Sequence, residues 1–289
     1  MLPFFRENTM QFLPYICLWL TLLVTLITQS RVFLGLGLII SFIAGMLIGT
    51  MTWIGLLALL LTGMLALLYF HKIFRKITFI GMLIGTFLLY FRALPGFHNL
   101  LVISAQHTSK LATAFTMHLN FDKVSMGYIL LFASQIPLSF RYFFNRQILL
   151  KTFPIIVMCM SLLMGAGLLT GYVAFDFKIP SFTLIWVLNN LFFVCVAEEV
   201  LFRGILQQTF MHVADKYKIH FIWPLMLASV IFGLAHFKAG VIFIGLASVA
   251  GMFYGYAYYK TQRLEASILT HFMVNFIHFL FFTYPARII

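Results

Sequence analysis

One apolar stretch of the chain contains three ionisable residues, Glu198, Glu199 and Arg203, in the string AEEVLFRG. A charged side chain in hydrocarbon costs about 3 kcal/mol or more, so each of them predicts a partner or a function. Glu199 and Arg203 are four residues apart and share a helix face, where an ion pair offsets much of the cost of burial. Glu198 points about 100° away and has no cation within helical reach, which makes it a candidate for proton chemistry.

Two histidines and an asparagine lie in later apolar stretches: His236 in IFGLAHF, His271 in THFMVNF, and Asn275 one helical turn after His271. If unbroken helices flank a turn at Tyr217, Glu198 and His236 lie at the same depth. His271 reaches that depth only if the helix of Glu198 extends into the cytoplasm. A lone membrane histidine is more often a packed residue, and Asn275 alone fits helix packing at least equally well. Glu198, His236, His271 and Asn275 together can lie at one depth in the membrane, and four polar side chains at one depth predict a functional site.

The composition places these residues in a membrane protein. Of the 289 residues, 63% are hydrophobic and 9% are charged, against roughly 25% charged residues in an ordinary soluble domain. Because ten apolar runs are spaced along the chain, we expect an all-α, polytopic bundle of eight to ten transmembrane helices. The runs are residues 13–28, 32–51, 53–70, 77–91, 127–140, 153–173, 182–210, 222–237, 241–259 and 264–284.

The net charge of +12 fits membrane topology better than a nucleic-acid surface, because no basic run is interleaved with exposed aromatic residues. Alternate loops carry eleven cations and are expected to be cytoplasmic: Arg31, Lys72, Arg75, Lys76, Arg141, Arg146, Lys151, Lys216, Lys218, Lys260 and Arg263. The three cysteines have no CxxC spacing, so neither a disulfide framework nor a cysteine metal cluster is expected. We expect N-terminal transmembrane helices over residues 1–150 and a C-terminal part over 151–289.

Three motifs resemble those of the CPBP family, the CAAX proteases and bacteriocin-processing enzymes. They are EExxxR at Glu198–Arg203, FxxxH at Phe232–His236 and HxxxN at His271–Asn275, in that order. The resemblance covers about residues 182–282. It implies an intramembrane endopeptidase in which Glu198 and His236 activate water, while His271 and Asn275 stabilise the oxyanion. Glu199 and Arg203 are expected to be chiefly structural, with Phe232 supporting the site.

The resemblance leaves the role of a metal open. One family mechanism is metal-free and uses the glutamate, whereas the competing view is a metalloprotease. Glu198, His236 and His271 satisfy a catalytic zinc set by ligand type, although no HExxH motif is present. The sequence therefore predicts the same three residues under both mechanisms, with zinc as the alternative cofactor.

The expected partners are membrane lipids and a membrane-associated or lipidated protein or peptide substrate, with no nucleic acid. Eukaryotic relatives cleave prenylated CAAX tails, whereas bacterial relatives serve bacteriocin maturation, immunity or other processing, so the substrate stays open. We expect a multi-pass protein of a prokaryotic cell membrane. A proton-coupled transporter and a non-catalytic scaffold or immunity protein are alternatives. The transporter is disfavoured because the sequence has no internal repeat, which transporters often have. The scaffold or immunity protein is disfavoured because all positions of the three motifs are intact.

Overall fold

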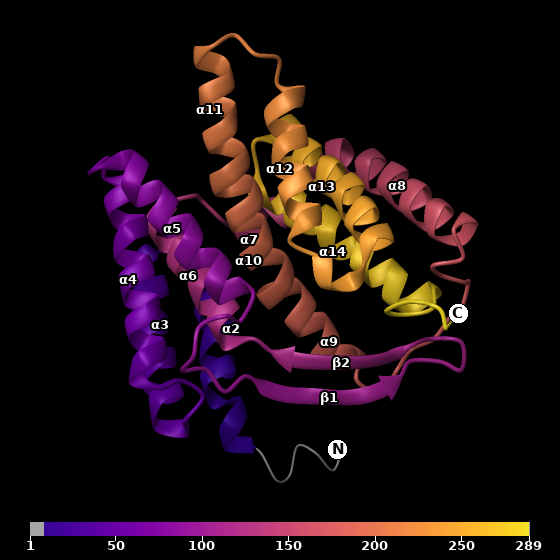
Figure 1. Ribbon diagram of the computed structural model, residues 1–289, viewed down its shortest axis with the longest axis horizontal. Helices are drawn as coiled ribbons and strands as arrows, with labels where there is room; N and C mark the ends of the chain where they lie inside the picture. The colour runs from indigo at the N-terminus through magenta and orange to yellow at the C-terminus, as the bar shows by residue number, and fades with distance from the viewer. Residues whose placement is uncertain (1–8, 289) are drawn as a thin grey trace. The chain divides into compact units, whose positions relative to one another are not determined.

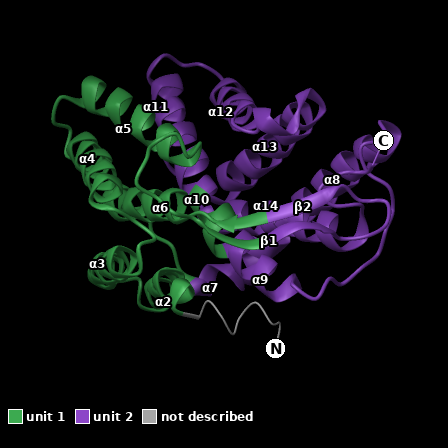
Figure 2. Cartoon of the chain, turned by 60° about the horizontal axis from the view of Figure 1, so that its bottom comes forward, with its two compact units in different colours: residues 1–102, 117–139, 192–197 green, residues 103–116, 140–191, 198–289 purple. Residues whose placement is uncertain are grey.

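The computed structural model describes residues 9–288, which form two compact units (Figure 1, Figure 2). Among the described residues, unit 1 comprises 9–102, 117–139 and 192–197, and unit 2 comprises 103–116, 140–191 and 198–288. Helices make up most of each unit. The chain is thus the helical membrane protein that its apolar runs predict, with differences in detail.

Unit 1 surrounds a short buried helix with longer apolar ones. Helix α6 contacts α3, α4 and α5, and most of its side chains are buried. Helices α3 and α4 are separated by a turn in which Gly49 adopts a left-handed φ of +81°, a conformation that suits glycine. The helices of unit 1 are α2 (Leu13–Thr28), α3 (Arg31–Ile48), α4 (Trp53–Phe70), α5 (Arg75–Tyr90) and α6 (Phe121–Ser134), preceded by the 3₁₀ turn η1 (Thr9–Phe12).

A β-hairpin is the one sheet within the described residues, and the sequence analysis missed it. Strand β1 (Leu100–His107) pairs with β2 (Ala114–Leu119), and Figure 1 draws the two arrows in opposite directions. The sequence predicts only a long loop between the apolar runs that end at residue 91 and begin at residue 127. Most β1 side chains are exposed or half-buried, which gives no strong alternation to detect.

A helical stretch runs from Thr183 to Lys216, and all of it except residues 192–197 belongs to unit 2. Two π-helical segments interrupt its α-helical geometry on either side of the two glutamates. Such segments are rare and often mark functional sites. The elements of the stretch are α9 (Thr183–Leu188), η2 (Asn189–Cys195), α10 (Val196–Glu199), η3 (Val200–Gln207) and α11 (Gln208–Lys216).

The remaining helices of unit 2 pack on that stretch and on one another. Helix α13 contacts α8, α12 and α14, and η3 contacts α11, α12, α13 and α14. These helices are α7 (Phe140–Phe143), α8 (Arg146–Leu169), α12 (Ile222–Leu234), the 3₁₀ turn η4 (Phe237–Ala239), α13 (Val241–Thr261) and α14 (Leu264–Phe281).

Seven helices in the described part of the chain are long and apolar enough to cross a membrane. The expected count of eight to ten is not confirmed, because three of the apolar runs form shorter helices, α5, α6 and α12. With 16, 14 and 13 residues, they fall short of the roughly 20 residues needed to cross the hydrocarbon. The seven long helices nevertheless make this an integral membrane protein.

Candidate active site

Glu199 is the fully buried centre of a network that joins three elements of unit 2. Its Oε2 lies 3.1 Å from Arg203 Nε and accepts a hydrogen bond from the Ser267 hydroxyl. Its Oε1 lies 2.8 Å from Nδ1 of His271. The spacing of EExxxR predicted the pair with Arg203, but it did not predict that the same carboxylate also holds a histidine of α14.

Arg203 is buried and its guanidinium is held on several sides. Its Nη2 donates to the carbonyl oxygen of Gly251 in α13 at 2.9 Å. Its Cζ lies 4.6 Å from the ring centroid of Phe232 and 5.4 Å from that of Tyr254, distances at which a cation is attracted to the ring face. Because these partners belong to α12 and α13, they fix the position of η3 against both helices.

Glu198 faces two imidazoles. Its Oε2 lies 3.9 Å from Nε2 of His236 and 3.9 Å from Nε2 of His271. The structure thus brings together the three residues that sequence reasoning placed at one depth. Both distances exceed a direct hydrogen bond, and polar contacts of this length are commonly bridged by water.

The other ring nitrogen of each histidine has a hydrogen-bond acceptor. His236 follows the end of α12, and its Nδ1 lies 2.8 Å from the carbonyl oxygen of Phe232, one turn earlier. His271 lies within α14 and its Nδ1 contacts Glu199. Carbonyl and carboxylate oxygens only accept, so we assign the proton to Nδ1 in both rings. In their neutral forms, both histidines therefore present an Nε2 lone pair toward Glu198.

Aromatic packing holds the two imidazoles in place. The Tyr254 ring stacks on that of His271 with a centroid separation of 4.6 Å. The Phe232 ring contacts both His236 and His271, at centroid distances of 4.8 Å and 5.7 Å. Phe232 thus contacts both histidines as well as Arg203. Both named residues of the FxxxH motif, Phe232 and His236, therefore belong to the site.

Asn275 lies one turn beyond His271 and its Nδ2 donates to Oδ1 of Asn190 at 3.2 Å. Asn190 belongs to η2, so this contact joins the fourth motif residue to the same helical stretch that carries Glu198. The bond fixes the amide orientation of Asn275.

Three contributors to the cluster escaped the sequence analysis: Asn190, Tyr254 and Ser267. For Ser267 a signal existed, since it precedes His271 by four residues and therefore shares its helix face. For Asn190 the signal was a pair of amides in an apolar run. Tyr254 lies among other tyrosines of α13, and nothing in its spacing distinguishes it.

Glu198, His236 and His271 offer donor atoms of the types that bind zinc. In tetrahedral zinc sites, bonds near 2.0–2.1 Å separate neighbouring ligand atoms by about 3.3 Å, which is shorter than the 3.9 Å from Glu198 to either imidazole. Among residues 9–288, no group of three or more His, Cys, Asp or Glu side chains is arranged to hold an ion. The ligand types fit zinc, but their spacing does not.

A buried carboxylate beside two histidines, among helices long enough to cross a membrane, is an arrangement that fits a membrane hydrolase. A comparison with known protein families agrees with this class of protein. Residues 180–277 match the family described as type II CAAX prenyl endopeptidase Rce1-like. The matched residues include all three motifs: EExxxR at Glu198–Arg203, FxxxH at Phe232–His236 and HxxxN at His271–Asn275. The match therefore confirms the resemblance that these motifs indicate. No curated protein and no solved structure matches the chain. The family supports a membrane protease of the CAAX type in general.

Proposed function

We propose that unit 2 is an intramembrane endopeptidase in which Glu198 activates a water molecule. The observation that carries the proposal is the placement of Glu198 Oε2 at 3.9 Å from the Nε2 atoms of both His236 and His271. A carboxylate and two imidazole lone pairs around one point can accept hydrogen bonds from the two hydrogens of a single water, and the carboxylate can then take its proton. The structural network of Glu199 and Arg203 keeps that geometry without itself facing the water.

In the proposed reaction, Glu198 removes a proton from the water as its oxygen attacks the peptide carbonyl. The tetrahedral intermediate then collapses, and Glu198 returns the proton to the departing amine, so the carboxylate ends as it began. His236 holds the same water. Because Asn275 uses one amide hydrogen on Asn190, its second amide hydrogen is able to stabilise the oxyanion, as is His271 when it is protonated.

The substrate that fits this site is a membrane-associated or lipidated protein or peptide, since the cluster belongs to apolar helices and the family match is to a CAAX prenyl endopeptidase. We place the protein in the cell membrane of a prokaryote. Zinc assistance is the alternative mechanism, and it would require movement of the three side chains toward one another.

The test is a cleavage screen with the purified full-length chain in detergent. Prenylated and unprenylated peptides are incubated with the wild type and with His236→Ala, and the products are identified by mass spectrometry. We expect internal peptide bonds to be cleaved by the wild type, and the rate to fall by about 10²-fold or more in the variant. Equal cleavage by both preparations would mean a contaminating protease and would contradict the proposal.

A further inference from the structure

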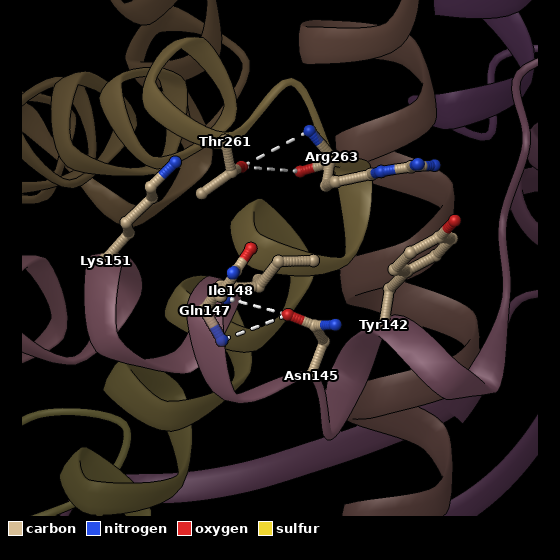
Figure 3. A pocket seen from close by; sticks show the side chains of 7 residues that line it. All are labelled: Tyr142, Asn145, Gln147, Ile148, Lys151, Thr261 and Arg263. Carbon is tan, nitrogen blue, oxygen red and sulfur yellow. Dashed lines mark hydrogen bonds between the residues drawn. The ribbon is translucent and has the colours of Figure 1, made fainter.

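A polar cavity of about 220 Å³ lies in unit 2 away from Glu198, between the start of α8 and the turn that joins α13 to α14. Figure 3 shows Asn145 and Lys151 on one side, with Thr261 and Arg263 on the other. The two segments come from loops that the charge distribution assigns to the cytoplasmic side. Their meeting at one cavity places them at the same end of unit 2.

Within the part of the chain that the structure describes, the cations at the cavity have no acidic partner. Among the described residues, neither Lys151 nor Arg263 forms an ion pair with a carboxylate. The Arg263 guanidinium lies 3.7 Å from the centroid of the Tyr142 ring, which holds it in place. Asn145 caps α8 by accepting from the amides of residues 147 and 148, so the positive charge comes from the two side chains and not from free helix amides.

The surroundings of the cavity are basic as well as apolar. Segments 140–152 and 258–264 contain five cations and no acid, and the nearby Glu265 is buried. Large apolar side chains are exposed on the same part of the chain, with Phe144 68% and Phe153 66% accessible. Cations beside exposed apolar side chains at the end of membrane helices fit a phospholipid, whose charged headgroup and acyl chains meet at this depth.

We propose that this cavity binds the phosphate of an anionic phospholipid headgroup. Lys151 and Arg263 contact the phosphate, while Phe144, which directly precedes Asn145, lies against the acyl chains. Free inorganic phosphate offers the same charge without the chains. The exposed aromatic side chain of Phe144 favours the lipid, and the experiment separates the two sources.

The test measures binding to the full-length protein in a neutral detergent. The probes are a short-chain phosphatidylglycerol, the phosphatidylcholine of equal chain length and inorganic phosphate. We expect phosphatidylglycerol to bind and to raise the thermal midpoint, with little effect of the other two. In Lys151→Gln, the Kd for phosphatidylglycerol should rise about fivefold, the loss expected for one cation near an anionic headgroup.

Two further variants keep the result interpretable. Lys216→Gln removes an exposed cation outside the cavity and should retain the wild-type Kd, which separates a site from general surface charge. Arg263→Lys retains the charge but not the planar stacking on Tyr142, so it should bind more tightly than Arg263→Gln. Equal Kd values for Lys151→Gln and Lys216→Gln would overturn the site. If inorganic phosphate binds as tightly as phosphatidylglycerol, the proposal that the ligand is a lipid is wrong.

Discussion

Helix contacts in unit 1 and unit 2 use glycine for different purposes. In unit 1, a Cβ on Gly85 of α5 would lie 2.5 Å from the Thr62 hydroxyl of α4, and that hydroxyl donates to Ala58 of its own helix. In unit 2, a Cβ on Gly255 of α13 would lie 2.5 Å from Oε1 of Gln207. There the Gln207 amide donates across to the Gly255 carbonyl oxygen at 2.9 Å.

The difference lies in where polar groups find their partners. Thr62 is satisfied within its own helix, so its contact with α5 is close packing of small residues. Arg203 and Gln207, one turn apart, both donate to carbonyl oxygens of α13, at Gly251 and Gly255. Partners on another helix fix that helix in register and angle. In unit 2, close packing of helices is therefore combined with hydrogen bonds that fix one helix against another. A site that needs three convergent side chains requires helices fixed in this way.

The largest effect on stability is expected from breaking the network in unit 2. Arg203→Ala leaves the carboxylate of Glu199 buried without its cation, which should cost about 3–5 kcal/mol. Thermal unfolding in detergent should show a clearly lower midpoint, together with a loss of cleavage because Glu199 also holds His271. Arg203→Lys is the control, since it keeps the charge. A wild-type midpoint for Arg203→Ala would contradict the structural role.

The two glycines give a more direct test of the comparison. In Gly85→Ala the new methyl group meets the stiff β-branched Thr62, so unfolding should be easier by about 1–3 kcal/mol with cleavage per folded molecule unchanged. In Gly255→Ala the flexible end of Gln207 can move aside, which should cost less stability but remove the bond to α13. Cleavage should then fall. If the variant that loses more stability also loses more cleavage activity, the two glycines do not have separate roles in packing and in positioning.

A smaller effect is expected from Asp122, a buried acid of unit 1. Its Oδ1 accepts from Asn99 Nδ2 at 3.2 Å and from the Lys123 amide at 2.8 Å. Burial raises the pKa of Asp122 despite these bonds. Because the folded pKa lies above the unfolded value of about 3.9, stability is lost as the pH rises from that unfolded value, and the loss is complete above the folded pKa.

Asp122→Asn should therefore raise the thermal midpoint at pH 7, by about 2–4 °C for each 1 kcal/mol recovered. The gain should shrink as the pH falls and vanish below about 3.9, where the wild-type side chain becomes protonated in both states. Thermal unfolding across this pH range measures it, with the exposed Asp215→Asn as control. A gain that is constant with pH would contradict titration of Asp122 as the cause.

The smallest expected effect is that of chelation. Because the spacing of Glu198, His236 and His271 does not fit zinc, exhaustive chelation should leave the cleavage rate unchanged. Metal analysis of the same active sample should give far less than one metal per chain. If a chelator inhibits reversibly and zinc restores turnover, the zinc mechanism is correct, and His236→Ala should then lose metal and activity together.

How much could be predicted from the sequence depended on the cost of burying each residue. Glu198, Glu199 and Arg203 stand out because a charge in an apolar helix needs a partner, and helical spacing then predicts which one. Asn190 and Ser267 are neutral, and such residues can be satisfied by nearby backbone, so their cross-helix bonds leave little trace in the sequence. The π-helical segments around the glutamates could not be predicted, because they arise from packing against neighbouring helices.

The expected span count is not confirmed, and the reason again lies in burial. Apolarity alone does not distinguish a helix that crosses a membrane from one buried among other helices. Helix α6 is apolar because it is surrounded in unit 1, and it is too short to cross the hydrocarbon. In contrast, the apolar runs 32–51 and 53–70 adjoin without a charge between them, and the structure contains two helices there, α3 and α4, separated by the left-handed turn at Gly49.

The central claim is that Glu198 performs the chemistry while its neighbour Glu199 holds the structure. The most direct test measures the cleavage rate and the thermal midpoint of Glu198→Gln, a change that keeps the shape and removes the base. Glu265→Gln, a buried acid in the first turn of α14, is the matched control and should cleave at the wild-type rate. For Glu198→Gln we predict a rate at least about 10²-fold lower at an unchanged midpoint. Wild-type turnover by a folded Glu198→Gln protein would contradict the account.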